Sequence, residues 1–138
     1  MNPLEVSIRQ YDRLSSRSHQ SGRYSRAGAL NRGAQGSIDV AVYQPVGNVG
    51  FVPAVELDAA KFQPIANIFA FSPIEVSHGV LPGMLAGGDG AIVVVGGLTA
   101  TVPMRGLSGV GPAMAAARNY IFTLNAEVGP KGVYAGTT

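Results

Sequence analysis

Ala91-Ile-Val-Val-Val95 is the stretch of this 138-residue sequence that decides the fold. It is a continuous apolar run, rich in β-branched residues, that follows the turn Gly87-Gly-Asp-Gly90. A short apolar run bounded by a turn is typical of a strand that a parallel sheet buries on both faces. The run therefore predicts a strand inside a parallel sheet.

A second strand is predicted upstream of this run. Ser37 to Tyr43 is short and β-branched, and it is followed by Pro45, whose missing N–H cannot join a ladder. Between the two strands, Phe62 to Leu85 has apolar residues at helical spacing, and Asp58 can cap the start of this helical region. Because Pro73 interrupts the spacing, we expect a kink or two helices.

The same alternation continues downstream. A loop from Gly96 to Gly111 precedes Pro112, which suits a first helical turn. One apolar stripe follows, made of Ala113, Ala117, Tyr120, Ile121, Leu124 and Val128. Gly129-Pro130 ends this helix, and Gly132 to Ala135 is the third predicted strand. Residues 37–138 are thus expected to form a partial doubly wound, Rossmann-like α/β domain with a parallel sheet and crossover helices.

Residues 1–36 have a different composition. They carry six arginines against two acidic residues, a net charge of +4, whereas the rest of the chain has −2. No Val, Ile, Leu, Met or Phe lies between Leu14 and Leu30, so we expect a basic, Arg- and Ser-rich, poorly ordered extension. An organelle transit peptide and a nucleic-acid arm are alternatives, and the lack of an aromatic platform disfavours nucleic acid.

Composition also narrows the chemistry. The chain has no cysteine and only two histidines, so no metal site is expected. His78, with Glu75 at helical spacing, is better explained as a surface or core histidine than as a catalytic dyad, and Ser108 as a loop or capping hydroxyl. No apolar run reaches the roughly 20 residues that a bilayer needs. We therefore expect a cytoplasmic protein with no membrane partner.

Several segments resemble those of the short-chain dehydrogenase/reductase family, in the family's order. They are Asp39-Val-Ala-Val-Tyr-Gln-Pro-Val46, Leu81-Pro-Gly-Met84, Gly90-Ala-Ile-Val-Val-Val95, Ala117-Arg-Asn-Tyr120 and Ala126-Glu-Val-Gly-Pro-Lys-Gly-Val-Tyr134. The resemblance covers about residues 37 to 136 and implies the carboxyl-terminal part of a nicotinamide-dependent oxidoreductase fold, with NAD or NADP as the cofactor.

The family's proton-transfer residues are not present at the matching positions. The family uses a tyrosine, a lysine four residues later, and a serine about thirteen residues before the tyrosine. These positions fall on Val110, Met114 and Gly97, and none of the three side chains can transfer a proton or polarise a carbonyl. The chain contains no Tyr-x-x-x-Lys sequence in any register. No catalytic residue is therefore predicted, and the resemblance is to a divergent member.

Four residues match places where the family approaches its cofactor. Gln44 and Pro45 follow the first predicted strand, Gly96 ends the second, and Asn67 resembles the family's helix asparagine. Asn67 is equally explained as an ordinary polar residue of a helix, since it lies about two residues further from Pro82 than usual. Residues 1–36 lack the strand and spaced glycines that hold a pyrophosphate, so this part of the fold is expected to be absent or replaced.

Three functions remain open from the sequence. The first is a short-chain dehydrogenase-like protein that is truncated or catalytically degenerate. The second is an active NAD(P)-dependent oxidoreductase completed by a partner chain. The third is a non-catalytic oligomeric scaffold, in which copies pair through the long helices or through an exposed strand edge at Ser37 to Tyr43.

Overall fold

A computed structural model describes residues 38–45, 47 and 50–138. The predicted basic extension over residues 1–36 lies outside this part of the chain.

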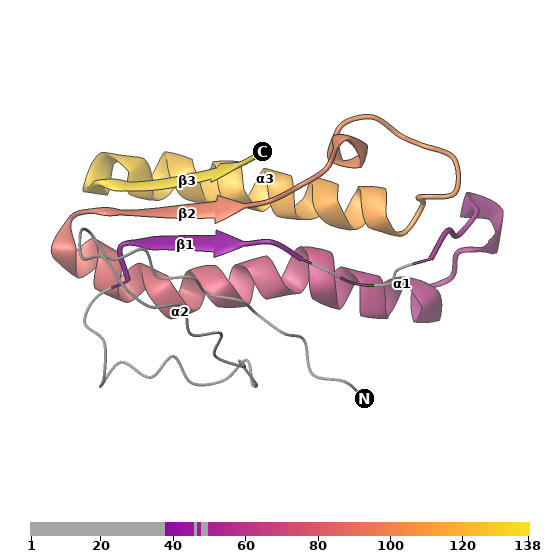
Figure 1. The fold of residues 1–138 in the computed structure, drawn as a ribbon, viewed down its shortest axis with the longest axis horizontal. Helices are drawn as coiled ribbons and strands as arrows, with labels where there is room; N and C mark the ends of the chain where they lie inside the picture. Colours follow the sequence, from indigo (N-terminus) through magenta and orange to yellow (C-terminus); the bar gives the residue numbers. More distant parts are fainter. Residues whose placement is uncertain (1–37, 46, 48–49) are drawn as a thin grey trace, which may run out of the picture.

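Within the described residues, three strands form one parallel sheet in the order β1-β2-β3 (Figure 1). They are β1 (Val40–Tyr43), β2 (Gly90–Val94) and β3 (Val133–Thr137). Ile92 at the centre of β2 is in register with Ala41 on one side and Ala135 on the other. The three predicted strands and the partial Rossmann-like α/β fold are therefore confirmed, with ends that differ by a few residues.

The first crossover is helical but not uniform. It consists of α1 (Ala59–Ala66), a π-helical turn η2 (Asn67–Phe71) and α2 (Ser72–Gly87). Asp58 caps α1 as predicted, because its carboxylate accepts a hydrogen bond from the Lys61 backbone N–H at 2.8 Å. The predicted interruption is present, but Pro73 does not cause it, since Pro73 lies in the first turn of α2, where a missing N–H is tolerated. The helix is interrupted by the π-turn instead.

The second crossover contains α3 (Val110–Val128), which begins two residues before Pro112. A single 3₁₀ turn, η4 (Gly129–Lys131), ends it. Gly132 then takes φ +90°, and a Cβ there would collide with the Gly88 carbonyl oxygen, so only glycine fits this turn. Two further 3₁₀ turns, η1 (Ala54–Glu56) and η3 (Leu98–Ala100), lie in the loops before α1 and α3.

The main core lies between the sheet and the helices α2 and α3, and we call it the sheet core. It contains Ala41, Tyr43, Val80, Met84, Ile92, Val94, Ile121, Val128, Val133 and Ala135. Because these residues come from all three strands and both helices, α2 and α3 cover the same face of the sheet. On the opposite face of β1, Val40 and Val42 are exposed.

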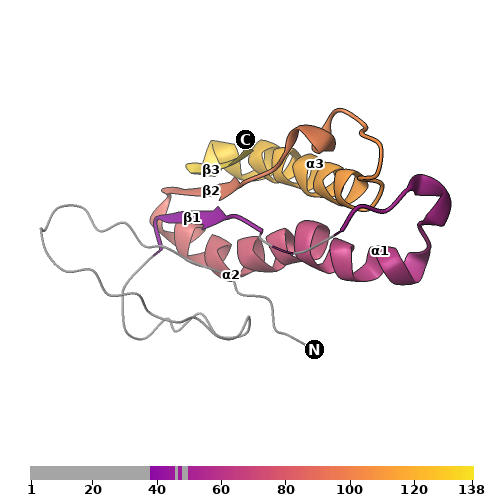
Figure 2. The same ribbon diagram turned by 45° about the vertical axis from the view of Figure 1, so that its right-hand side comes forward.

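A second, smaller cluster lies at the other end of α3, and we call it the edge cluster. It contains Ile65, Ala66, Phe69, Ala70, Val110 and Ala113. Figures 1 and 2 show that α1 and the loop before α3 extend beyond the arrowheads of the strands. The edge cluster therefore holds together the part of the molecule next to the carboxyl ends of the sheet.

The helical stretch Ala59–Gly87 is 29 residues long. By length and composition alone it could cross a bilayer, with a mean hydropathy of 1.2 over its most apolar window. That window is 39% buried, and Val80 and Met84 pack in the sheet core. Core helices of soluble proteins meet the same criterion. A search of the sequence for continuous apolar runs does not find this stretch, because its apolar residues are spread over α1, η2 and α2.

Candidate functional site

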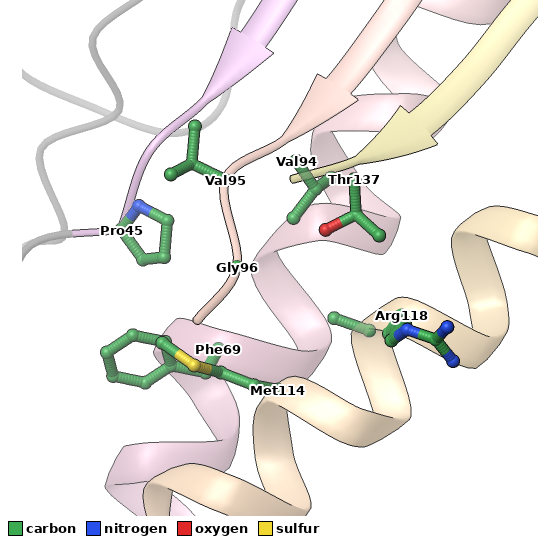
Figure 3. A pocket seen from close by; sticks show the side chains of 9 residues that line it. Pro45, Phe69, Val94, Val95, Gly96, Met114, Arg118 and Thr137 are labelled. Atoms are coloured by element: carbon green, nitrogen blue, oxygen red, sulfur yellow. The ribbon is translucent and has the colours of Figure 1, made fainter. Parts of the chain in front are cut away.

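The carboxyl ends of the three strands meet at a small cavity (Figure 3). Pro45 follows β1, Val95 and Gly96 follow β2, and Thr137 ends β3, and all four line this cavity. Ligands of open parallel α/β sheets bind at this edge, which makes the cavity the candidate site. Its free space is ≈ 10 Å³, enough for about one water molecule.

Helical residues close the cavity on its other side. Phe69 of η2 and Met114 of α3 both line it, and Met114 packs against the edge cluster, to which Phe69 belongs, so the two side chains form an apolar wall. Arg118 is the one charged residue among the described lining residues, but its guanidinium lies over the Phe122 ring, 4.7 Å from the centroid. Figure 3 shows this guanidinium pointing away from the cavity. The interior is therefore nearly apolar.

The positions that match the family's proton-transfer residues lie beside this cavity. The Met114 sulfur is 3.4 Å from the point where a Cβ on Gly97 would lie, and it accepts a hydrogen bond from the Thr99 hydroxyl at 3.6 Å. Val110, one helical turn before Met114, is buried in the edge cluster. A thioether, a methylene and an isopropyl group thus occupy these places, and none of them can donate or accept a proton in a reaction.

The four residues predicted to contact a cofactor are only partly brought together. Pro45 and Gly96 both line the cavity. Gln44 is exposed and is not among the lining residues. Asn67 is also exposed, and its side-chain oxygen accepts a hydrogen bond from Gln63 Nε2 at 2.9 Å. Of the four predicted residues, Pro45 and Gly96 therefore lie at the cavity, and Gln44 and Asn67 lie outside it.

The π-turn is the feature of the site that the sequence analysis missed. Its Ile68 carbonyl accepts a hydrogen bond from the Tyr43 hydroxyl at 2.8 Å, which ties the end of β1 to the helix. The Asn67 carbonyl accepts from both the backbone N–H and the hydroxyl of Ser72. Burial raises the pKa of Tyr43 above its ordinary value, and a hydrogen bond with the Ser72 side chain opposes part of that shift.

The remaining sequence candidates lie elsewhere. His78 is exposed on α2. Ser108 is a loop hydroxyl, as predicted, because it donates to the Val52 carbonyl at 2.5 Å. Across the described part of the chain, no group of three or more His, Asp or Glu side chains could hold a metal ion.

Comparison with protein families identifies the fold. The family model described as short chain dehydrogenase matches residues 26–137, which is most of the chain. This chain belongs to the short-chain dehydrogenase family. No curated protein matches it. The resemblance first noted in five short segments is therefore confirmed over residues 26–137.

Solved structures of the family show the same fold at low sequence identity. A halohydrin dehalogenase bound to ethyl (2S)-oxiran-2-ylacetate matches with a TM-score of 0.72 and 19% identity, covering 77% of this chain and 42% of its own. A short-chain dehydrogenase from Streptomyces avermitilis matches at 0.66 and 22%, covering 71% and 36%. A 7α-hydroxysteroid dehydrogenase complexed with NADH and 7-oxo glycochenodeoxycholic acid matches at 0.64 and 23%, covering 70% and 37%. The chain spans less than half the length of these structures.

The described residues do not fit the nicotinamide that the family implies. The cavity has free space for about one water molecule, and apart from Arg118 and Thr137 its lining, which includes Phe69 and Met114, is apolar. The lysine position beside the cavity carries the uncharged Met114. Residues 38–45, 47 and 50–138 therefore provide no step through a nicotinamide by themselves.

Proposed function

We propose that this chain is a catalytically degenerate short-chain dehydrogenase that carries out no proton transfer of its own. The observation that carries the proposal is that Met114 lies beside Gly97, its sulfur 3.4 Å from where a Cβ on Gly97 would lie, at the positions where the family would place a lysine and a serine. A reductase must deliver a proton to the substrate oxygen and stabilise its developing charge. The described side chains at this cavity offer neither function.

The direct test is oxidation of NADPH and NADH by the purified chain in the presence of a panel of ketones and aldehydes. We expect no loss of nicotinamide absorbance above the buffer blank, with a complete family member assayed in parallel as the positive control. Oxidation that saturates with one substrate would overturn the proposal. Oxidation that requires a second, co-purified polypeptide would overturn the assignment as a degenerate enzyme and support the alternative of an enzyme completed by a partner chain.

Nucleotide binding without chemistry is a separate question. We propose that Pro45 and Gly96 are the residues that contact a bound NAD or NADP, with Gln44 and Asn67 as outer candidates. The location of Pro45 and Gly96 at the carboxyl edge supports their assignment. Alanine variants of Gln44 and Asn67 should leave any measured affinity nearly unchanged, because both side chains point to solvent.

The second candidate function is a non-catalytic oligomeric scaffold. Two aromatic side chains on the helical layer favour it, since Phe71 and Phe122 are 49% and 43% exposed. We propose that a second copy packs on these helices, in a soluble, cytoplasmic protein without a membrane partner. Sedimentation velocity should then give a mass that rises with concentration, and Phe71→Ser with Phe122→Ser should lower it. A monomer mass at every concentration would contradict the scaffold.

A further inference from the structure

The helix between β1 and β2 has an unusual repeat of buried positions. Ile65, Phe69, Pro73 and Ser77 are all buried and recur every four residues. Three turns of an α-helix use about 11 residues, whereas these three intervals use twelve. In a continuous α-helix, Ile65 and Ser77 would lie roughly 120° apart around the axis. One additional residue must be accommodated, and the π-turn η2 accommodates it.

A π-turn is rare because it interrupts the regular i to i−4 hydrogen bonds. Here, two side-chain hydroxyls supply hydrogen bonds to its carbonyl groups. Tyr43 donates to the Ile68 carbonyl at 2.8 Å, and Ser72 donates to the Asn67 carbonyl at 2.7 Å. The Tyr43 bond is the more distinctive one, because it comes from a residue 25 positions away, at the end of β1, whose side chain is only 5% exposed.

The π-turn also determines which side chain faces the candidate site. Phe69 lies within the turn, is 5% exposed and forms the cavity wall beside Met114. Conversion to a continuous α-helix would rotate α1 by about 100° relative to α2. Because Val80 and Met84 hold α2 in the sheet core, this rotation would turn Ile65 of α1 out of the edge cluster. The geometry of the turn and the closure of the cavity are therefore coupled.

We propose that the Tyr43 hydroxyl is a latch that holds η2 in its π-form and thereby keeps Phe69 closed against Met114 at the carboxyl edge of the sheet. Tyr43 is a positioning residue in this arrangement. The cavity opens only when the Ile68 carbonyl loses its donor and the turn rearranges. This device is separate from the proposed loss of catalysis, because it concerns access to the edge and not proton transfer.

The test uses Tyr43→Phe, which removes the hydroxyl and keeps the ring. Ser77→Ala is the matched control, because it removes another buried hydroxyl-to-carbonyl bond, from Ser77 to Pro73 at 2.8 Å, in the regular part of α2. Native-state hydrogen exchange of the backbone amides between Ile68 and Ile74 should become roughly 5-fold faster in Tyr43→Phe than in the wild type. Pro73 has no amide proton and is not observed. The same amides should exchange at the wild-type rate in Ser77→Ala once the rates are corrected for global stability.

Methyl NMR of the methionines gives the second readout. The Met114 methyl resonance should move in Tyr43→Phe because Phe69 shifts beside it, whereas the Met84 methyl in the sheet core should not. Unchanged exchange at the π-turn would overturn the proposal, since packing alone would then hold the turn. Equal effects of the two substitutions, or movement of both methyl resonances, would also overturn it, because they would indicate general destabilisation.

Discussion

The sheet core and the edge cluster are both apolar, but they are built in different ways. In the sheet core, alternate strand residues such as Ala41 and Ile92 meet regular helical stripes from α2 and α3. In the edge cluster, Ile65 and Phe69 come from a helix that contains a π-turn, and they pack where Gly109 leaves space at the start of α3. The regular region specifies the family fold, and the irregular region lies next to the candidate site at the carboxyl edge of the sheet.

Truncation of a central residue should show how much of the stability resides in the sheet core. Ile121 is fully buried between α3 and the sheet. We expect Ile121→Ala to lower the free energy of unfolding by about 4 kcal/mol. The substitution leaves a cavity, and the rigid sheet beside it cannot move in to fill the space. Urea denaturation followed by circular dichroism measures the change. A loss below about 1 kcal/mol would mean that this region is loosely packed.

The same truncation in the edge cluster sharpens the comparison. Ile65 is nearly buried, but its neighbours lie in loops and at a π-turn that can relax. Ile65→Ala should therefore cost about 2 kcal/mol, roughly half the loss expected for Ile121→Ala. The two variants are compared in one denaturation series. Equal losses would show that the two clusters are equally rigid and would remove the distinction between them.

Alkaline pH should affect the bond that links the two regions. Burial raises the pKa of Tyr43, so the folded state keeps the phenolic proton at pH values where the unfolded chain releases it. The contribution of this group is complete below its ordinary pKa of 10.0 and is lost as pH rises through the folded value. The melting temperature should fall more steeply above pH 10.0 in the wild type than in Tyr43→Phe. Parallel curves would show that Tyr43 does not contribute.

The smallest effect is expected at the amino-terminal end of α1. The pKa of Asp58 is lowered mainly by its hydrogen bond from the Lys61 backbone N–H. A lowered pKa gives stability that is present above the ordinary value of 3.8 and is lost as pH falls through the folded value. Asp58→Ala should lower the melting temperature slightly at neutral pH and hardly at all in acid. Asp58→Asn, which keeps a capping oxygen, is the control.

The sequence predicted the regular region well and the irregular region poorly. The β-branched run from Ala91 to Val95 predicted the parallel sheet, and the apolar stripe through Ala117 and Ile121 predicted α3. Both predictions succeeded because the spacing of apolar residues along the chain reflects which side chains are buried. The π-turn was missed because it depends on Tyr43, far away in sequence. The four-residue spacing of Ile65, Phe69 and Pro73 was a signal that could have revealed it.

The candidate site was predicted in part for a similar reason. Pro45 and Gly96 both line the cavity, because the residues after parallel strands share one edge of the sheet, and their contact with a cofactor stays a prediction. Phe69 and Thr137 were not singled out, since neither carries a motif and both reach the cavity only through the packing of whole elements. Asn67 was placed by its likeness to a family residue, and the π-turn leaves its side chain exposed.

A two-dimensional amide NMR spectrum of the chain, recorded without and then with NADPH and NADH, tests the central claim most directly. The cavity at the carboxyl edge has free space for about one water molecule, so we predict a well-dispersed spectrum in which the amides of Gly96, Met114 and Thr137 do not move on titration. Saturable shifts at these three amides would contradict the account, because they would show that a nicotinamide nucleotide enters a site that the described residues close.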